Sequence, residues 1–242
     1  SVDESIIAVV ASKGACERGS LYLVDASSLT KHGPFELGYN PDAVDIAVDN
    51  KYVVVVNEFD YEDGVSGGCD SLGFPGVSIY DISNGISSPT LVKDMKITHT
   101  GSNGNLAEPE GVKIAPDGET VYMTLQESNE IGWFSISSPP DILQNKVAFA
   151  NPEHEPDGIW INSDGTLACT GGEYDGTIGI IDLTTINSNS PTIHYAKLAD
   201  DLPSSWDWED KRKGIEPEEV VIVEAGDKTF VMATIQDAGA VV

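Results

Sequence analysis

Short apolar runs separated by turn residues recur along the whole chain, and helical periodicity is almost absent. Four of these runs begin alike, with a proline, an acidic residue and then a short apolar stretch; the prolines are Pro41, Pro109, Pro156 and Pro217. Eight residues after each proline comes a stretch rich in Asp, Asn and Gly. Such residues favour tight hairpins because Gly and Asn tolerate positive φ. The pattern therefore predicts a strand, a turn and a second strand, repeated four times.

Further strands follow each turn. Second strands are expected at residues 52–57, 120–126, 166–171 and 229–236, third strands at 77–82, 131–136 and 178–183, and weaker fourth strands at 90–97, 146–150 and 192–198. Near the N-terminus, residues 6–12 and 20–26 resemble a second and a third strand. The best exception to the β pattern is a short helical turn around residues 141–144. Four strands per unit of roughly 45–65 residues is typical of a β-propeller blade.

The repeat predicts an all-β fold, a β-propeller of four-stranded antiparallel blades that occupies residues 1–242 as one domain. The blade units are expected at residues 6–38, 41–98, 108–150, 155–199 and 216–242. The first and last of these five units are incomplete, so we expect the chain to be a portion of a larger propeller. A β-sandwich is the alternative all-β fold, but sandwiches do not repeat one strand-turn-strand pattern in this register.

The strongly negative net charge of the chain limits the kinds of molecule that it can bind. The chain has 13 Lys and Arg against 40 Asp and Glu, a formal net charge of −27. This charge argues against nucleic-acid binding, which needs a basic surface. No apolar run approaches the 18 residues of a membrane-spanning helix, so we expect no direct membrane insertion. Strong acidity suits a cation-rich medium or cationic partners.

Two motifs resemble a known family. Residues 108–130, which begin Glu108-Pro-Glu-Gly-Val, closely resemble the central motif of choice-of-anchor I domain proteins, and residues 210–218 resemble a second motif of that family. In that second motif Ile215 and Glu219 replace the usual Pro and Gly. The family consists of extracellular β-propellers, often described as mesenchyme-specific cell-surface glycoprotein-like. The resemblance implies an extracellular or cell-surface location and no well-defined general activity.

Acidic residues recur at one position of four units. The residue after each proline is Asp42, Glu110, Asp157 or Glu218. The expected second strands end in further oxygen-bearing side chains, which are Asn57 and Glu58, Gln126 and Glu127, Glu173, and Gln236 and Asp237. In a propeller these positions converge on one end of the central channel, where they predict a site for calcium, which takes six to eight oxygen ligands. Alternatively, each acid accepts hydrogen bonds from a neighbouring blade and sets the register between blades.

The same acids allow a catalytic alternative. A calcium-dependent hydrolase of phosphate or lactone esters would use Glu110, Asp157 and Glu218 as ligands, with Glu173 or His154 as general base. The acidic motifs hold almost no Lys or Arg to assist a phosphate ester, and no nucleophile elbow or phosphate-binding glycine loop occurs. These observations favour a protein without catalytic residues.

Other candidates lie in expected loops. Cys16 and Cys69 fall between second and third strands of consecutive blades, where a disulfide is plausible in an oxidising compartment, while Cys169 lies within a strand and is expected to be a buried thiol. Trp206 and Trp208 stand in one loop and are candidates for contact with a partner, or else they cap the core. The acidic segment 58–64 lacks the spacing of an EF-hand and is expected to be a solvated loop.

The sequence thus favours an extracellular β-propeller module with a structural, adhesive or assembly role, for which calcium is a candidate cofactor and register-setting hydrogen bonds of the acids are the other interpretation. Its expected partners are proteins or glycans at the cell surface or in an extracellular assembly. The calcium-dependent hydrolase is the alternative.

Overall fold

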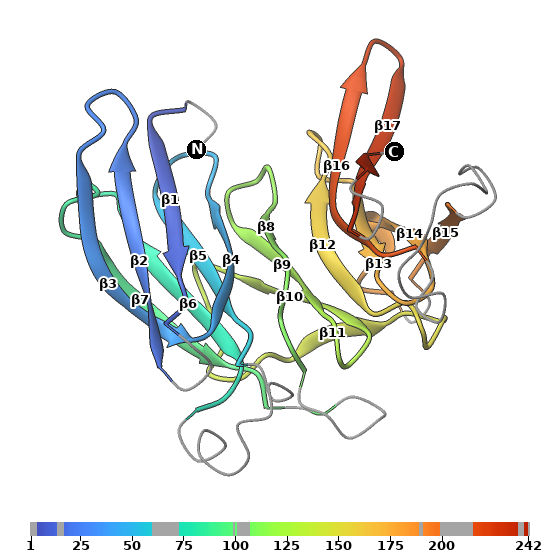
Figure 1. Ribbon diagram of the computed structural model, residues 1–242, viewed down its shortest axis with the longest axis horizontal. Coiled ribbons are helices and arrows are strands. Elements are labelled where there is room, and N and C mark those ends of the chain that lie inside the picture. The colour runs from blue at the N-terminus through green and yellow to red at the C-terminus, as the bar shows by residue number, and fades with distance from the viewer. Residues whose placement is uncertain are drawn as a thin grey trace.

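A computed structural model describes residues 4–13, 17–59, 73–98, 100, 107–188, 191–198, 215–236 and 240–241. In this part of the chain the strands form five antiparallel sheets, which follow one another along the chain around an open arc (Figure 1). Three sheets have four strands, and the first and last have three. The predicted all-β fold of four-stranded units, with incomplete units at both ends, is confirmed.

The strands run in chain order across each sheet. The first sheet contains β1 (Ile6–Ala11), β2 (Arg18–Asp25) and β3 (Lys31–Tyr39), and the second contains β4 (Pro41–Ile46), β5 (Tyr52–Asn57), β6 (Gly76–Asp81) and β7 (Thr90–Lys96). The third contains β8 (Val112–Ile114), β9 (Thr120–Leu125), β10 (Glu130–Ser135) and β11 (Asn145–Ala148). The fourth contains β12 (Pro156–Ile161), β13 (Leu167–Gly172), β14 (Thr177–Asp182) and β15 (Ile193–Lys197), and the fifth contains β16 (Pro217–Ala225), β17 (Lys228–Ile235) and β18 (Ala240–Val241).

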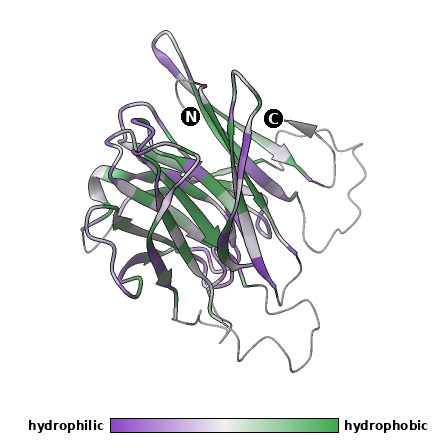
Figure 2. Ribbon diagram, turned by 90° about the vertical axis from the view of Figure 1, so that its left-hand side faces the viewer, coloured by the Kyte–Doolittle hydropathy of each residue, from purple (hydrophilic) through white to green (hydrophobic). Residues whose placement is uncertain are grey.

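The central strands are buried on both faces. Four consecutive valines in β5, Val53 to Val56, are completely buried. Because side chains alternate along a strand, Val53 and Val55 pack into the core between the first and second sheets, while Val54 and Val56 pack into the core between the second and third. A strand between two neighbouring sheets therefore has a continuous apolar run. Figure 2 shows the strands as mainly hydrophobic and the turns as hydrophilic.

The two end sheets each have one neighbour. In β1, Ala8 and Val10 pack against the core, whereas Ile7 and Val9 are 46% and 45% exposed. Residues of β17 alternate in the same way, and Phe230 and Met232 lie on the exposed side. The outward faces of both end sheets thus carry apolar side chains, like the faces that pack on a neighbouring sheet.

The predicted helical turn at residues 141–144 is wrong. Ile142 instead forms a parallel bridge with Lys96, which joins the edges of the second and third sheets. The one helix in the described residues is the 3₁₀ turn Leu183–Thr185, which follows β14 and is capped by the Asp182 side chain. No helix in this part of the chain is long and apolar enough to cross a membrane.

Candidate metal centre

In three of the five sheets the first strand begins irregularly, at the position of the recurrent acid. In β4, β12 and β16 the pairing with the next strand shifts register between the proline and the third residue after it. An extra residue of this kind bends a strand and redirects its side chains. Asp42, Asp157 and Glu218 each follow the proline directly and so lie within the irregularity. Glu110 precedes β8, whose first residue is Val112.

Four equivalent backbone hydrogen bonds, one in each of four sheets, fix a second set of side chains next to the recurrent acids. The amides of Glu58, Gln126, Glu173 and Gln236 each donate to the carbonyl of the residue before the proline, over 2.7–3.2 Å. These four side chains therefore stand at equivalent positions beside the recurrent acids. Their partners differ: Gln126 donates to the Glu173 carboxylate at 2.6 Å, and Asn40 donates to Glu58 at 2.6 Å.

Glycine lets the first strands approach closely. A Cβ atom at Gly111 would lie 2.8 Å from the Asp157 carbonyl, and one at Gly158 would lie 2.8 Å from the Glu218 carbonyl. Neither space would hold a larger side chain without backbone movement. Each glycine follows a recurrent acid, so the close approach brings the acids of neighbouring sheets together. In the fifth sheet the same position is Glu219, which adds a carboxylate.

Three carboxylates meet where the second and third sheets adjoin. Asp42, Glu58 and Glu110 each offer an oxygen, and these oxygens all lie within 4.8 Å of one another. The Asp42 and Glu110 side chains are also hydrogen-bonded to each other, so one of them carries a proton in this arrangement. Asp42 is exposed, while Glu58 and Glu110 are half-buried.

Crowding opposes ionisation of these groups. Desolvation, together with the charges of Glu58, Asp42 and Asp157, raises the pKa of Glu110 to about 11. Desolvation also raises the pKa of Asp42, although its hydrogen bond with Glu110 acts in the opposite direction. None of the influences on the pKa of Glu110 comes from a basic residue. All of these influences therefore favour the protonated form of Glu110.

The acids of the fourth and fifth sheets form a continuation of the cluster. Desolvation and the charges of Glu218, Glu219, Asp42 and Glu173 raise the pKa of Asp157 to about 8. Desolvation and the charge of Asp42 raise the pKa of Glu219, and the positive charge of Lys113 partly offsets this rise. The predicted ligands thus influence one another electrostatically, but among them only Asp42 and Glu110 join the compact group of three. Glu58 completes that group, and its position at the end of a second strand was the sequence signal for it.

The donor set fits a hard divalent cation. Oxygens bound to one Ca²⁺ at 2.3–2.6 Å can lie at most about 5 Å apart, and the three carboxylates satisfy this limit. A metal bound here would replace the shared proton and neutralise the repulsion. Asp42, Glu58 and Glu110 are therefore the residues that could hold calcium.

His154 lies elsewhere, in a closed hydrogen-bonded network of the fourth sheet. Its ring is completely buried, with Nδ1 3.2 Å from both Asp175 Oδ2 and Thr177 Oγ1, and Nε2 3.0 Å from Thr170 Oγ1. Phe149 packs on the ring at 4.5 Å. Both ring nitrogens are occupied, so His154 is not available as a general base. Glu173, the other proposed base, accepts from Gln126 beside the acids.

The remaining candidates divide between described and undescribed parts of the chain. Cys169 is a buried free thiol, as predicted, and desolvation raises its pKa to about 12. Cys16 and Cys69, predicted to form a disulfide, lie outside the described residues, as do Trp206 and Trp208.

Comparison with solved structures places this fold among the β-propellers. A putative 6-phosphogluconolactonase from Bacteroides uniformis is similar with a TM-score of 0.64 and 12% identity, over 99% of this chain and 63% of that one. Virginiamycin B lyase from Staphylococcus aureus gives a TM-score of 0.57 and 12% identity, over 99% and 67%. KlAtg21, solved with the coiled coil of AgAtg16, gives 0.59 and 17%, over 96% and 61%.

These similarities establish the fold alone, because every identity is below one fifth. The chain spans 53% and 63% of the first two similar structures. No protein-family model and no curated protein matches the sequence. The resemblance to choice-of-anchor I domain proteins therefore stays a prediction.

Proposed function

We propose that this chain is a calcium-stabilised, extracellular β-propeller module of the choice-of-anchor I type, with a structural, adhesive or assembly role. One observation carries the proposal: carboxylates of two neighbouring sheets, Asp42 with Glu58 and Glu110, converge within 4.8 Å with no basic group among the influences on the pKa of Glu110. A cation between these groups would join the two sheets. It would thereby stabilise the propeller.

An extracellular location agrees with this chemistry. Calcium sites in extracellular modules bind weakly, with dissociation constants of about 10⁻⁴–10⁻³ M, because calcium outside cells is abundant. A site of three carboxylates, only partly buried, suits that range. The net charge of −27 is also compatible with a cation-rich medium.

The alternative, a calcium-dependent hydrolase of phosphate or lactone esters, receives less support. His154 cannot act as a base while its nitrogens are engaged in the buried network. Glu173 accepts a hydrogen bond from Gln126 and lies among other acids. No basic residue is among the influences on the pKa of Glu110, so this carboxyl gives no sign of the cationic assistance that a phosphate ester needs.

Thermal unfolding with and without a chelator tests the proposal. In a buffer with about 10 mM calcium the protein should bind about one calcium per chain, and chelation should lower the melting temperature by several degrees, as expected when a ligand that binds only the folded state is removed. Glu110→Gln should remove the effect. Calcium-dependent turnover of a phosphate or lactone ester, lost in Glu110→Gln, would instead favour the hydrolase. An unchanged melting temperature would contradict the calcium site.

A further inference from the structure

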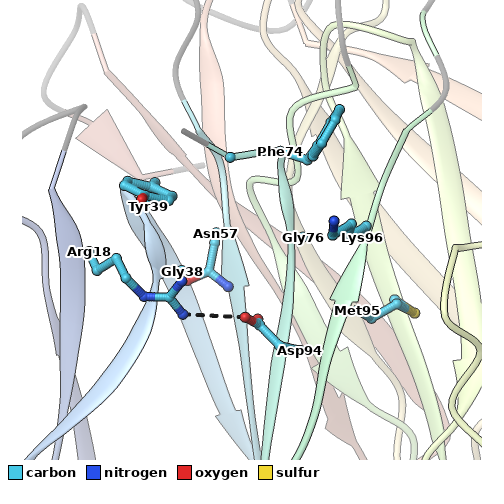
Figure 3. Close-up of a pocket in the computed structure, with 10 residues that line it drawn as sticks. Arg18, Gly38, Tyr39, Asn57, Phe74, Gly76, Asp94, Met95 and Lys96 are labelled. Atoms are coloured by element: carbon cyan, nitrogen blue, oxygen red, sulfur yellow. Dashed lines mark hydrogen bonds and ion pairs between the residues drawn. The ribbon is translucent and has the colours of Figure 1, made fainter. Parts of the chain in front are cut away.

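A pocket apart from the carboxylate cluster opens between the first and second sheets. It has a volume of about 370 Å³ and is lined by residues of β2, β3, β5, β6 and β7. Figure 3 shows Arg18 and Tyr39 on one side, Phe74 and Lys96 on the other, and Asn57 and Asp94 between them. The pocket thus combines two cations and two aromatic rings in a chain that is strongly acidic overall.

The two cations differ in how their charge is compensated. The Arg18 guanidinium lies 3.0 Å from Glu36 and 3.3 Å from Asp94, so two carboxylates neutralise it. Lys96 forms no ion pair with any residue that the structure describes, and its ammonium lies 5.2 Å from the centre of the Phe74 ring. The four charges of Arg18, Lys96, Glu36 and Asp94 sum to zero, but among the described residues Lys96 is left to pair directly with an anionic ligand. A single such ammonium group suits a ligand with one carboxylate better than a phosphate dianion.

The polar wall of the pocket presents mainly acceptors. Asp94 accepts from Ser78, which in turn accepts from the Asn57 amide. The Asn57 carbonyl oxygen is buried and has no hydrogen-bond partner, a state that costs stability until a donor reaches it. Asn57 lies beside Arg18 in the wall of the pocket (Figure 3), and a ligand hydroxyl is the kind of donor that its carbonyl oxygen lacks.

The apolar wall offers an aromatic surface. Phe74 is 47% exposed at the rim, and Tyr39 lies under the Arg18 guanidinium at 5.7 Å. Flat C–H faces of sugar rings stack on aromatic side chains that remain accessible in this way. One cation, several acceptors and an exposed ring are together the features that recognise a hydroxylated monoanion.

We propose that this pocket binds a hexuronate unit of an acidic polysaccharide. The sugar carboxylate pairs with Lys96, the ring stacks on Phe74, and hydroxyl groups donate to Asp94 and Asn57. The inference rests on the proposed extracellular role, since it names a glycan partner for it. It does not require the calcium site, because none of its contacts involves Asp42, Glu58 or Glu110.

Calorimetric titration with two matched sugars tests the pocket. Methyl β-D-glucopyranosiduronate and methyl β-D-glucopyranoside differ only in the carboxylate, so we expect the first to bind one site at least tenfold more tightly. Inorganic phosphate should not compete with it. Equal affinities for the two sugars, tighter binding of phosphate, or no binding of the uronate would overturn the proposal.

Variants locate the binding. Lys96→Gln should weaken the uronate at least tenfold and leave the glucoside unchanged, whereas Phe74→Ala should weaken both sugars. Lys93→Gln is the matched control, because Lys93 belongs to the same strand but pairs with Asp141 outside the pocket. If Lys96→Gln and Lys93→Gln behave alike, the assignment to this pocket is wrong. Repeating the titration with chelator separates the two proposals, since the uronate should still bind without calcium.

Discussion

Two groups of polar side chains near the ends of the strands differ in how burial affects the pKa of their acids. The network around His154 contains both donors and acceptors. Desolvation alone would raise the pKa of Asp175, but its hydrogen bonds with His154 and Thr177 outweigh desolvation and lower that pKa. The cluster of Asp42, Glu58 and Glu110 contains acceptors only, and the pKa of Glu110 rises to about 11. The first group is complete within the protein. The second consists of three carboxylates, whose mutual repulsion a proton or a cation would relieve.

The difference separates a structural role from a binding role. A satisfied buried network stabilises one arrangement of the core and has no capacity left for a ligand. A group of like charges favours any cation that neutralises it, so its energy depends on what the solvent supplies. Three perturbations should therefore affect the two regions differently.

The largest effect is expected for His154→Ala. It leaves a cavity beside Phe149 and removes the hydrogen bonds to Asp175, Thr170 and Thr177, so we expect a loss of about 3 kcal/mol in the free energy of unfolding. Chemical denaturation would measure it. The loss should be the same with calcium and with chelator. His194→Ala is the control, because this histidine is exposed and should change stability by less than about 0.5 kcal/mol.

A calcium-dependent effect is expected for Glu110→Gln. With a pKa of about 11, Glu110 is protonated in the folded protein at neutral pH without a metal but ionised in the unfolded chain. An amide of the same shape does not ionise on unfolding, so Glu110→Gln should raise stability in chelator. Calcium at 10–100 times its dissociation constant should stabilise the native protein by about 1.5–2.7 kcal/mol and the variant not at all. Melting curves at several calcium concentrations would show it. A variant that retained the calcium response would show that the ion binds elsewhere.

The smallest effect is a pH dependence. A carboxyl whose pKa is higher in the folded state stabilises the fold at low pH, and this stabilisation is lost as pH rises through the folded pKa. Asp157, with a pKa raised to about 8, and Glu110, raised to about 11, should therefore lower stability in chelator from about pH 5 upwards. We expect a loss of about 1 kcal/mol by pH 9, because solvent screens these partly exposed groups.

Calcium should reverse that trend. The ion binds ionised carboxylates, so its stabilising effect should grow with pH over the same interval. Groups with lowered pKa, such as Asp175, finish titrating at lower pH and do not contribute there. Equal pH profiles with and without calcium would argue that the cluster takes up no metal.

The fold could be predicted because its repeat is local. The proline marks where the first strand begins in three sheets, β4, β12 and β16, and the turn after it sets the hairpin. The burial of the β5 valines on both faces follows from the position of this strand between two neighbouring units. The helical turn at residues 141–144 failed because Ile142 is held by an edge-to-edge bridge with Lys96, which no local pattern indicates.

The candidate site could be predicted only in part. Asp42 and Glu110 follow from the repeat, but equivalent positions do not guarantee contact, and Asp157 and Glu218 fall outside the compact group. Glu58 belongs to it because its backbone amide pairs with Asn40 at the end of β5. The burial of His154 depends on Asp175 and Thr177, more than twenty residues away, so its place in the sequence gave no sign of it.

Isothermal titration of chelator-treated protein with calcium measures directly whether the carboxylate cluster binds the ion. We expect one site with a dissociation constant of about 10⁻⁴–10⁻³ M. Proton release should make the heat depend on the buffer, and Asp42→Asn or Glu110→Gln should abolish it. The absence of saturable binding up to about 10 mM calcium, or full binding by both variants, would contradict it.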